Sequence, residues 1–400
     1  MTIPQMPGSD SAGSDRPKDR AADANLPTDA NNRNSDNRIA VALIYGGASP
    51  EHSVSCTSAG IVMNHIDTSK YRVVPIGITR GGAWTVGTTD TEKLIKSGRT
   101  MHSVPELGQA AAGEEIALSV NPSRAGELLY VAGDRAGEVF DTVDVVFPVL
   151  HGPNGEDGHL QGLLELSKVP YVGPGVLASS VGMDKERTKN LLQAHDLPIG
   201  KQWVLHRDEV LPDEVKDEFG LPVFVKPARG GSSIGISKVD DWSDLERAVE
   251  LAREHDWKVI VEQGIVGAEV ECGVLQRPDG TIEVSLPAML TGTDASDEGF
   301  YGFDTKYLDN VVDVQIPADL ADDVIAEVQQ LSRQTFRALG CDGLTRVDFF
   351  VTESGPVINE VNTMPGLTPA SAYPMMFKAA GIEFPEVVDI LIQRAFTAQR

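Results

Sequence analysis

The sequence is short of cysteine, of positive charge and of long apolar runs, and each shortage excludes a class of protein. Its three cysteines (Cys56, Cys272 and Cys341) lie far apart without CxxC spacing, which excludes a disulfide framework and a thiolate zinc site. No apolar run approaches the ~18 residues of a membrane span, and the first residues lack the basic and apolar regions of a secretory signal. We therefore expect a cytoplasmic protein without a membrane partner.

The chain is strongly acidic, with 34 Lys and Arg against 59 Asp and Glu and a formal net charge of −25. This balance argues against a nucleic-acid partner, because surfaces that bind a phosphate backbone are basic. Its 400 residues exceed what one compact core usually holds, so we expect two or three domains of α/β and α+β type. Residues 1–37 contain no aromatic residue and are rich in Pro, Ser, Asp, Asn and Ala, so we expect a disordered tail.

The N-terminal part predicts alternating strands and helices. Ile39–Gly47 has the pattern of a buried parallel strand that ends in glycines, and a helix is expected from there to about His65. Such a strand, turn and helix can hold an anion or a carboxylate, although the Walker A pattern GxxxxGK[ST] occurs nowhere in the chain. Two more buried strands are expected at Tyr71–Gly77 and Val143–Leu150. The latter leads into His151, which either lines a ligand site at the strand end or has a structural role.

Apolar spacing and terminal residues predict three further helices. Gly155–Lys168 is expected to bury one leucine-rich side, formed by Leu160, Leu163, Leu164 and Leu166. Ser243–His255 is expected to begin with a capping box. Asp319–Leu339 has the clearest amphipathic pattern, and Gly340 is placed to end it.

Leu221–Val239 predicts two short strands around a loop of three glycines and two serines, with Lys226 in the first strand. Glycines allow backbone N–H groups to approach phosphate oxygens, while the hydroxyl groups add donors and the lysine adds charge. The segment therefore indicates a phosphate-binding loop. The alternative is a flexible hairpin tip, which leaves a lysine in an otherwise apolar strand unexplained.

A second hairpin is predicted by the alternation in Thr345–Val351 and Pro356–Asn362, which flank a turn. If the two polar faces match, four side chains converge: Arg346, Asp348, Glu360 and Asn362. Two carboxylates and an amide oxygen are hard ligands suited to Mg²⁺ held together with substrate phosphates. Alternatively, the polar face of this hairpin only meets water.

From about Arg38 to its C-terminus the chain resembles the D-alanine–D-alanine ligases of the ATP-grasp superfamily. Five stretches match in order: GGASPEHSVS, HGPNGEDGHLQG, MDK with VKPARGGSSIG, FDTKY, and TRVDFF with INEVNTMPGLT. The resemblance implies an ATP-grasp fold with an N-terminal Rossmann-like domain at residues 38–177. A central subdomain with the glycine-rich loop would span residues 178–262. A C-terminal subdomain with the lid loop, metal site and oxyanion donors would span residues 263–400.

The resemblance also implies a role for each matching residue. The ATP-binding set would be Lys185, Lys226, Ser233, Glu262, Ile265 and Glu269. The ligands of two Mg²⁺ or Mn²⁺ ions would be Asp348, Glu360 and Asn362. The catalytic set would be Glu51, Ser232, Tyr307, Arg346 and Gly366. The substrate-binding set would be His151, Lys306 and Ser371.

These roles imply the ATP-dependent joining of two D-alanines for peptidoglycan precursors, by a homodimer. Physical chemistry agrees, because a carboxylate becomes a good electrophile toward an amine once ATP converts it to an acyl phosphate. The first step needs lysines and metal ions along the triphosphate, and the second needs donors such as Arg346 aimed at an oxyanion. The loop Asp294–Lys306 would close as a lid that keeps water from the acyl phosphate.

Two stretches depart from the family pattern, and three alternatives follow from particular residues. Phe303-Asp304-Thr305 replaces the more usual Tyr-Asp-Tyr-Glu-Ala, and Gly182 stands where a bulkier residue is as common. A D-alanine–D-lactate ligase would lack the tyrosine of the Lys-Tyr pair, so Tyr307 favours an amine as second substrate. Another ATP-grasp carboxylate–amine ligase would lack the GGASPEHSVS stretch. A non-catalytic nucleotide-binding regulator would have no need of Arg346 as an oxyanion donor.

Overall fold

The N-terminal sheet is organised around β1 (Ile39–Gly46), which lies between two parallel neighbours, β2 (Tyr71–Ile78) and β7 (Val145–Pro148). A short strand, β3 (Trp84–Val86), pairs antiparallel with β2 at the edge. Because successive side chains of a strand point to opposite faces, β1 contributes to two different cores. One includes α1 (His52–His65), and the other includes α2 (His159–Ser167) and the strands β4 (Ile116–Leu118) and β5 (Glu127–Tyr130). The predicted buried parallel strand is confirmed.

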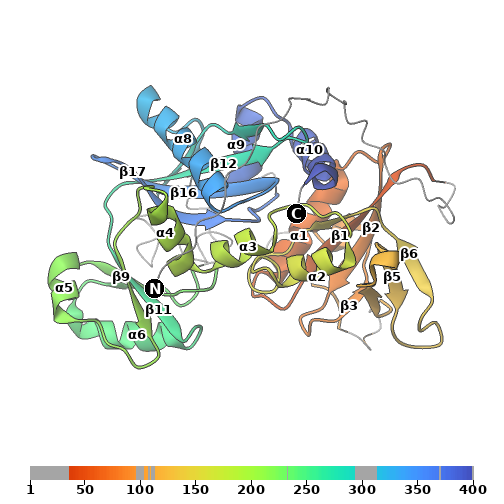
Figure 1. The fold of residues 1–400 in the computed structure, drawn as a ribbon, viewed down its shortest axis with the longest axis horizontal. Helices are drawn as coiled ribbons and strands as arrows, with labels where there is room; N and C mark the ends of the chain where they lie inside the picture. Colours follow the sequence, from red (N-terminus) through yellow and green to blue (C-terminus); the bar gives the residue numbers. More distant parts are fainter. Residues whose placement is uncertain are drawn as a thin grey trace, which may run out of the picture. The chain divides into compact units, whose positions relative to one another are not determined.

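The computed structural model in Figure 1 describes residues 36–95, 103–106, 109, 113–231, 233–292, 313–368 and 371–398. Residues 38–400 cluster into one unit, separate from residues 1–37. The predicted lid loop and almost all of the predicted tail lie outside the described residues, as do Ser232, Lys306 and Tyr307.

A small sheet and two helices complete the N-terminal region. The sheet is antiparallel, in the order β4 (Ile116–Leu118), β5 (Glu127–Tyr130) and β6 (Val139–Thr142). The helices are α2 (His159–Ser167) and α3 (Val176–Met183).

The central region is an antiparallel sheet in the order β10, β9, β11, β8. Its strands are β8 (Gln202–His206), β9 (Val223–Pro227), β10 (Ser237–Val239) and β11 (Lys258–Gln263). The helices α5 (Asp213–Phe219) and α6 (Leu245–Arg253) bury their apolar sides against it. The predicted strands on either side of the glycine-rich loop are thus β9 and β10, and they pair directly.

A second antiparallel sheet forms the C-terminal region, in the order β15, β14, β12, β16, β17, with β13 paired to β12. Its strands are β12 (Ala268–Gln276), β13 (Ile282–Val284), β14 (Ala288–Thr291), β15 (Asp313–Gln315), β16 (Leu344–Thr352) and β17 (Gly355–Asn362). The helices are α4 (Lys185–Ala194), α8 (Asp322–Ala338), α9 (Ala372–Ala379) and α10 (Phe384–Thr397). Helices α4 and α8 contact each other, and α8 packs on this sheet.

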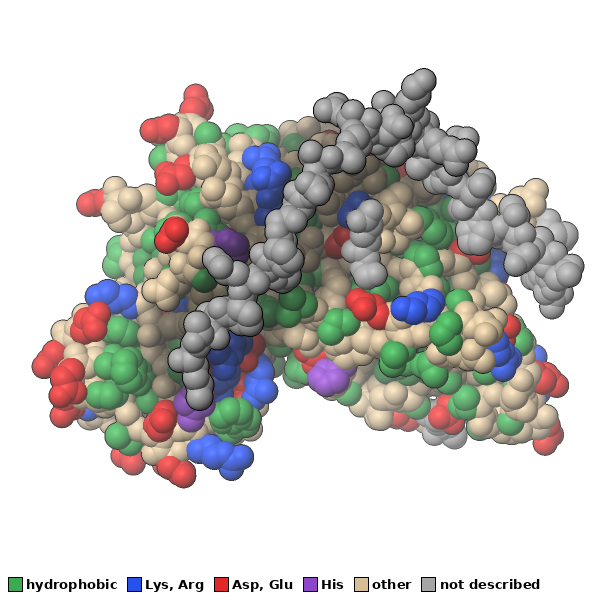
Figure 2. Space-filling model, in the orientation of Figure 1, with side chains coloured by type: hydrophobic (Ala, Val, Ile, Leu, Met, Phe, Trp, Pro, Cys, Tyr) green, Lys and Arg blue, Asp and Glu red, His purple; other side chains and the backbone are tan. Residues whose placement is uncertain are grey.

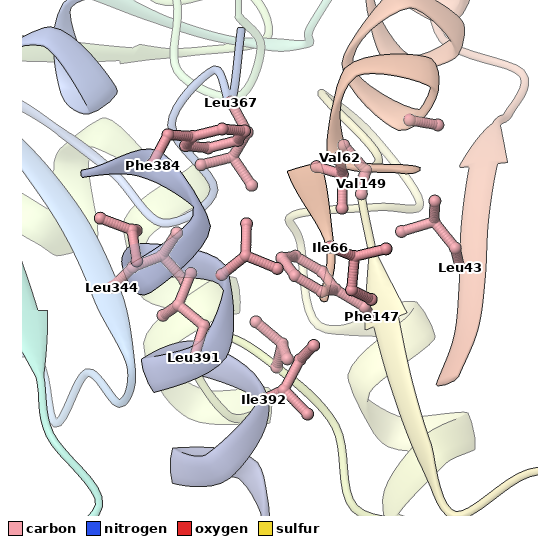
Figure 3. Packing of buried hydrophobic residues seen from close by; sticks show 14 of the residues in the cluster. Leu43, Val62, Ile66, Phe147, Val149, Leu344, Leu367, Phe384, Leu391 and Ile392 are labelled. Carbon is pink, nitrogen blue, oxygen red and sulfur yellow. The ribbon is translucent and has the colours of Figure 1, made fainter. Parts of the chain in front are cut away.

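The last helix packs against the first domain. Leu391 and Ile392 of α10 lie in one buried cluster with Phe147 of β7 and Ile66 after α1, as Figure 3 shows. Full burial of such a side chain contributes about 1.5–3 kcal/mol. The C-terminal end of the chain therefore joins the N-terminal sheet to the second antiparallel sheet.

Two predicted helix details are wrong. Helix α2 begins at His159 rather than Gly155, and Leu166 is 64% exposed. At 3.6 residues per turn, the buried side passes through Leu160, Leu164 and Ser167, so that Leu166 points away from it. The expected capping box is absent at α6, where a short 3₁₀ turn precedes the helix and the Asp241 side chain accepts the Ser243 N–H at 2.9 Å.

Acidic side chains are prominent on the described surface (Figure 2), as expected from the net charge of −25. On the face drawn in Figure 2, red acidic side chains gather over α5 and α6 and at one end of α8. Among the described residues, no helix combines the length and the apolar character needed to cross a membrane.

Candidate active site

The hairpin of β16 and β17 brings the predicted metal ligands together. In its register Arg346 faces Asn362 and Asp348 faces Glu360, and a β-bulge follows between Asp348 and Phe349. Arg346 forms a bidentate ion pair with Asp348, in which Nε lies 2.7 Å from Oδ1 and Nη2 lies 2.8 Å from Oδ2. The Asn362 amide donates to Asp348 Oδ2 at 2.9 Å. The predicted convergence of polar faces is confirmed, whereas metal binding by these residues remains a prediction.

Lys185 connects this hairpin to the glycine-rich loop. Its Nζ lies 2.9 Å from Glu360 Oε1 and donates to the Gly230 carbonyl at 2.8 Å. Burial is the largest single effect and would lower the pKa of Lys185, but the carboxylates of Glu360, Glu262 and Asp184 together outweigh it, and the pKa is raised. The first residue of α4 is therefore a stable cation between the two elements predicted to hold metal and phosphate.

The donor set of the hairpin fits a hard divalent cation. Asp348, Glu360 and Asn362 offer carboxylate and amide oxygens, the ligands that Mg²⁺ and Mn²⁺ prefer. Their present partners, Arg346 and Lys185, are cations, as expected where negative charge converges. Within the described residues, no group of three or more His, Cys, Asp and Glu side chains could hold a metal ion.

A second buried cluster lies on the central sheet. Glu262 of β11 is placed between two lysines, with Oε2 2.6 Å from Lys226 Nζ and Oε1 2.6 Å from Lys189 Nζ. Burial alone would raise the pKa of Glu262, but Lys189 and Lys226 lower it to about 2. The sequence-based prediction missed Lys189. Its signal was available, because positions i and i+4 of a helix share a face, and Lys189 lies four residues after Lys185.

Glu262 is expected to stabilise the fold at neutral pH and to lose this effect in acid. A carboxyl whose pKa falls on folding stabilises above its unfolded value, and the effect disappears as pH falls through the folded value. Here the window runs from 4.5 down to about 2. Glu262→Gln should cost about 3–5 kcal/mol at pH 7, since it leaves two buried lysines without their carboxylate. The difference from wild type should shrink below pH 4.5.

Urea unfolding at pH 7, 4 and 3 measures this difference in the free energy of unfolding. Glu218→Gln is a matched control, because Glu218 pairs with Lys201 on the surface with 58% of its side chain exposed. The control should change the unfolding free energy by less than about 1 kcal/mol. A Glu262→Gln deficit that stays constant with pH would contradict the role given to this carboxylate.

Glu51, the predicted ligand of the first ammonium group, is buried where two glycine-containing loops approach. A Cβ atom added at Gly152 would lie 3.0 Å from Glu51 Oε2, and one added at Gly231 would lie 3.3 Å from it. Gly152 also has φ +75°, a conformation that favours glycine. Glycines at these positions let the loop after β7 and the glycine-rich loop both come close to the carboxylate.

His151 is buried beside this region. Its Nε2 has no hydrogen-bond partner among the described residues, and burial lowers its pKa, so the ring is neutral at pH 7. Neutral imidazole with a free ring nitrogen can bind a polar substrate group. The structure thus supports a ligand-facing role over a structural one, and this role remains a prediction.

Glu156 is a residue that the sequence-based prediction missed. Its carboxylate accepts the Gly152 N–H at 2.7 Å and the Met364 N–H at 3.0 Å. It therefore joins the loop after β7 to the loop that follows Asn362. Burial, followed by the charge of Glu51, raises its pKa to about 8. Its sequence signal was an acid within the glycine-rich stretch HGPNGEDG.

The remaining predicted residues lie around these clusters. Gly366 approaches Ser371 so closely that a Cβ on Gly366 would lie 2.7 Å from Ser371 Oγ, and Ser371 directly precedes α9. Ser233 adopts φ +57° within the glycine-rich loop. Ile265 and Glu269 lie just before and at the start of β12, on the connection from β11. None of the described contacts tests their individual roles.

An N-terminal Rossmann-like domain followed by two antiparallel sheets, with lysines and carboxylates between them, defines a protein of the ATP-grasp class. Family models described as D-ala D-ala ligase N-terminus and D-ala D-ala ligase C-terminus match residues 40–174 and 191–393. The chain belongs to the D-alanine–D-alanine ligase family. The fold and the family expected from the sequence are confirmed.

Individual relatives match this chain over most of their length. The D-alanine–D-alanine ligase of Corynebacterium diphtheriae is 57% identical over 366 residues, which cover 92% of this chain and 98% of the relative. Among solved structures, the VanG D-Ala:D-Ser ligase from Enterococcus faecalis has a TM-score of 0.77 and 37% identity, covering 90% of this chain and 99% of that chain. The D-alanine–D-alanine ligase from Coxiella burnetii has a TM-score of 0.75 and 29% identity, covering 90% and 94%.

Proposed function

We propose that this chain joins two D-alanine molecules into D-alanyl-D-alanine through an acyl phosphate, releasing ADP and phosphate, for peptidoglycan precursors. The observation that carries the proposal is that the Lys185 ammonium group forms an ion pair with Glu360 and donates a hydrogen bond to the Gly230 carbonyl. This contact supports the proposal, because Lys185 would then lie between a hairpin that would bind metal ions and a loop that would bind phosphate. The high identity to relatives named D-alanine–D-alanine ligase supports the substrate.

ATP would lie between the two antiparallel sheets. Lys185, Lys226 and the N–H groups of the glycine-rich loop would bind its phosphates, with Ser233 as a further donor. The connection from Glu262 through Ile265 would contact adenine, and Glu269 would bind the ribose. In this arrangement each oxygen of the Glu262 carboxylate pairs with one lysine, Lys189 or Lys226. Glu262 would thus also hold Lys226 in place.

The family uses ATP together with a divalent metal, and here two Mg²⁺ or Mn²⁺ ions would be held by Asp348, Glu360 and Asn362. When bound, the ions would neutralise the charge that builds up on the transferred phosphoryl group. Glu51 would hold the ammonium group of the first D-alanine, with His151 nearby. The carboxylate of this first D-alanine would then lie next to the terminal phosphate of ATP.

The second step is attack of a free amine on the acyl phosphate. Arg346 and the Gly366 N–H would donate to the oxyanion of the tetrahedral intermediate, whose collapse expels phosphate. Ser371, at the N-terminus of α9, would bind the carboxylate of the second D-alanine. That position suits an anion, because the first N–H groups of a helix are unpaired and its dipole is positive there.

The lid tyrosine provides a test of second-substrate choice. From the family resemblance, Ser232 and Tyr307 would complete a hydrogen-bonded trio with Glu51, and Lys306 would contact the substrate. Tyr307→Phe is expected to raise ATP hydrolysis without ligation, because a poorly anchored lid admits water to the acyl phosphate. The ratio of phosphate released to dipeptide formed measures this effect. An unchanged ratio would contradict the assignment.

The domain division, assembly and location belong to the same proposal. The N-terminal domain would span residues 38–177, and the two halves of the ATP-binding region would span residues 178–262 and 263–400. Residues 1–37 would form a tail outside the catalytic unit. The chain would act as a homodimer in the cytoplasm, with small molecules as its substrates and neither nucleic acid nor membrane as a partner.

ATP-dependent phosphate release tests the reaction directly. The chain is incubated with D-alanine alone, and then with D-alanine plus D-lactate or D-serine, and products are identified by mass. We expect phosphate release with D-alanine alone and a dipeptide product. Release that requires D-lactate or D-serine would identify that compound as the second substrate and would retain the ligase mechanism. ATP binding without release for any pair would favour a non-catalytic regulator.

A further inference from the structure

A buried ionic cluster lies beside the start of α4 and the start of the glycine-rich loop. Its centre is Lys258, the first residue of β11, which is only 4% exposed. Lys258 Nζ lies 2.8 and 2.6 Å from the two carboxylate oxygens of Asp184 and 2.7 Å from Glu186 Oε2. Removing an ammonium group from water is costly unless it is paired in good geometry. The three side chains therefore hold one another in a single arrangement.

Both carboxylates belong to the first turn of α4. Asp184 is the N-cap residue, whose side chain accepts the Arg187 N–H at 3.2 Å, and it directly precedes Lys185. The Lys185 N–H donates to the Ala228 carbonyl at 3.0 Å, and its Nζ donates to the Gly230 carbonyl. Lys258 thus holds the residue adjacent to the lysine that would bind the phosphates of ATP.

The same corner of β11 also holds the first residues of the glycine-rich loop. The Lys258 carbonyl accepts the Ala228 N–H at 2.9 Å. Asp256 accepts the Arg229 N–H at 3.0 Å, the Arg229 guanidinium at 2.9 and 2.6 Å, and the Lys258 N–H at 3.1 Å. Both sides of the predicted phosphate site, helix α4 and the loop, are therefore attached to Asp256 and Lys258.

We propose that Lys258 is a positioning residue of the ATP site. By holding Asp184 and Glu186, it fixes the N-terminus of α4 relative to the glycine-rich loop, so that Lys185 and the loop N–H groups reach the same phosphates. The inference rests on the proposed function, because it takes Lys185 and the loop as phosphate-binding groups. It assigns Lys258 a larger effect on ATP affinity than on D-alanine affinity, since Lys185 and the loop would bind ATP directly, whereas the loop only approaches Glu51 at Gly231.

Lys258→Met, which removes the charge and keeps the apolar stem, tests the proposal. We expect the Kd for ATP to rise about 10–100-fold, as measured by calorimetry with Mg²⁺ and without D-alanine. Metal sites lose affinity by a similar factor when a residue that orients a binding side chain, without touching the bound group, is removed. The KM for D-alanine at saturating ATP should change less than about twofold. Lys258→Arg should recover most of the affinity, because a guanidinium can still donate to both carboxylates.

Lys201→Met is the matched control, since Lys201 pairs with Glu218 in the same region and its side chain is 53% exposed. Its Kd for ATP should equal that of wild type. A folded Lys258→Met variant with unchanged ATP affinity would overturn the proposal, and so would an equal loss of ATP and D-alanine affinity, which indicates a merely structural role.

If Lys258→Met does not fold, Glu186→Gln decides instead, because it removes one of the two negative charges that face Lys258 and leaves the Lys258–Asp184 contact. Weakened ATP binding by this variant supports the proposal, and unchanged binding overturns it. A wild-type chain that binds ATP but forms no dipeptide would overturn the proposed reaction alone. The comparison of ATP affinities would still decide the role of Lys258.

Discussion

Glu360→Gln is expected to reduce ligation by at least about 10³-fold while the chain stays folded, since metal-assisted charge stabilisation contributes several kcal/mol to the transition state. Glu360 is opposite Asp348 in the hairpin register and pairs with Lys185. The substitution keeps the shape of the side chain but removes the negative charge that both a divalent ion and Lys185 require. Steady-state ligation at saturating ATP and Mg²⁺ measures the loss.

Glu353→Gln is the control for this experiment, because Glu353 lies exposed in the turn of the same hairpin, away from the polar face. It should retain wild-type turnover. The melting temperature of Glu360→Gln should fall by no more than about 2–4 °C, the shift that corresponds to ~1 kcal/mol. Near-normal ligation by a folded Glu360→Gln variant would remove the metal assignment.

Arg346→Met is expected to lower kcat about 10²–10³-fold, the usual cost of losing one oxyanion donor. The KM for ATP should change much less, because the donor acts on charge that develops in the second step. Arg346 is held in position by its ion pairs with Asp348 and with Glu271, whose Oε1 lies 3.3 Å from Nη2. Arg346→Lys should recover part of the rate, since it restores the charge without the two-pronged geometry.

Single-turnover measurements separate the two steps. With Arg346→Met, acyl-phosphate formation from ATP and the first D-alanine should proceed, and dipeptide formation should be slow. Arg337→Met, at an exposed position on α8, is the control and should show wild-type kinetics. A variant that loses ATP binding and ligation in parallel would show that Arg346 organises Asp348 rather than stabilising the oxyanion.

The predicted strands and most helices followed from short-range patterns. Alternation in β16 and β17 placed Arg346, Asp348, Glu360 and Asn362 on matching faces, because a strand has a side-chain period of two and a hairpin leaves little choice of partner. Gly340 was recognised as the end of α8 for a similar reason. It adopts φ +66°, which glycine tolerates better than other residues.

Helix starts were less predictable, because several side chains compete for the same N–H groups. Asp241 accepts the Ser243 N–H and begins a 3₁₀ turn, so the capping box expected from Ser243 and Glu246 does not form. For α2, the glycine-rich stretch before His159 is occupied by hydrogen bonds that hold its loop, among them those accepted by Glu156. Local spacing alone does not decide such competitions.

Residue types at short, regular spacing were enough to predict the fold class, the family and the polar face of the β16–β17 hairpin. Only the tertiary structure decided which distant groups meet. Lys189 reaches Glu262 across 73 positions, Glu156 reaches Met364 across 208, and Lys258 holds Asp184 across 74. Such pairs form because buried charges and N–H groups require partners, and packing of whole elements selects the partner that is within reach.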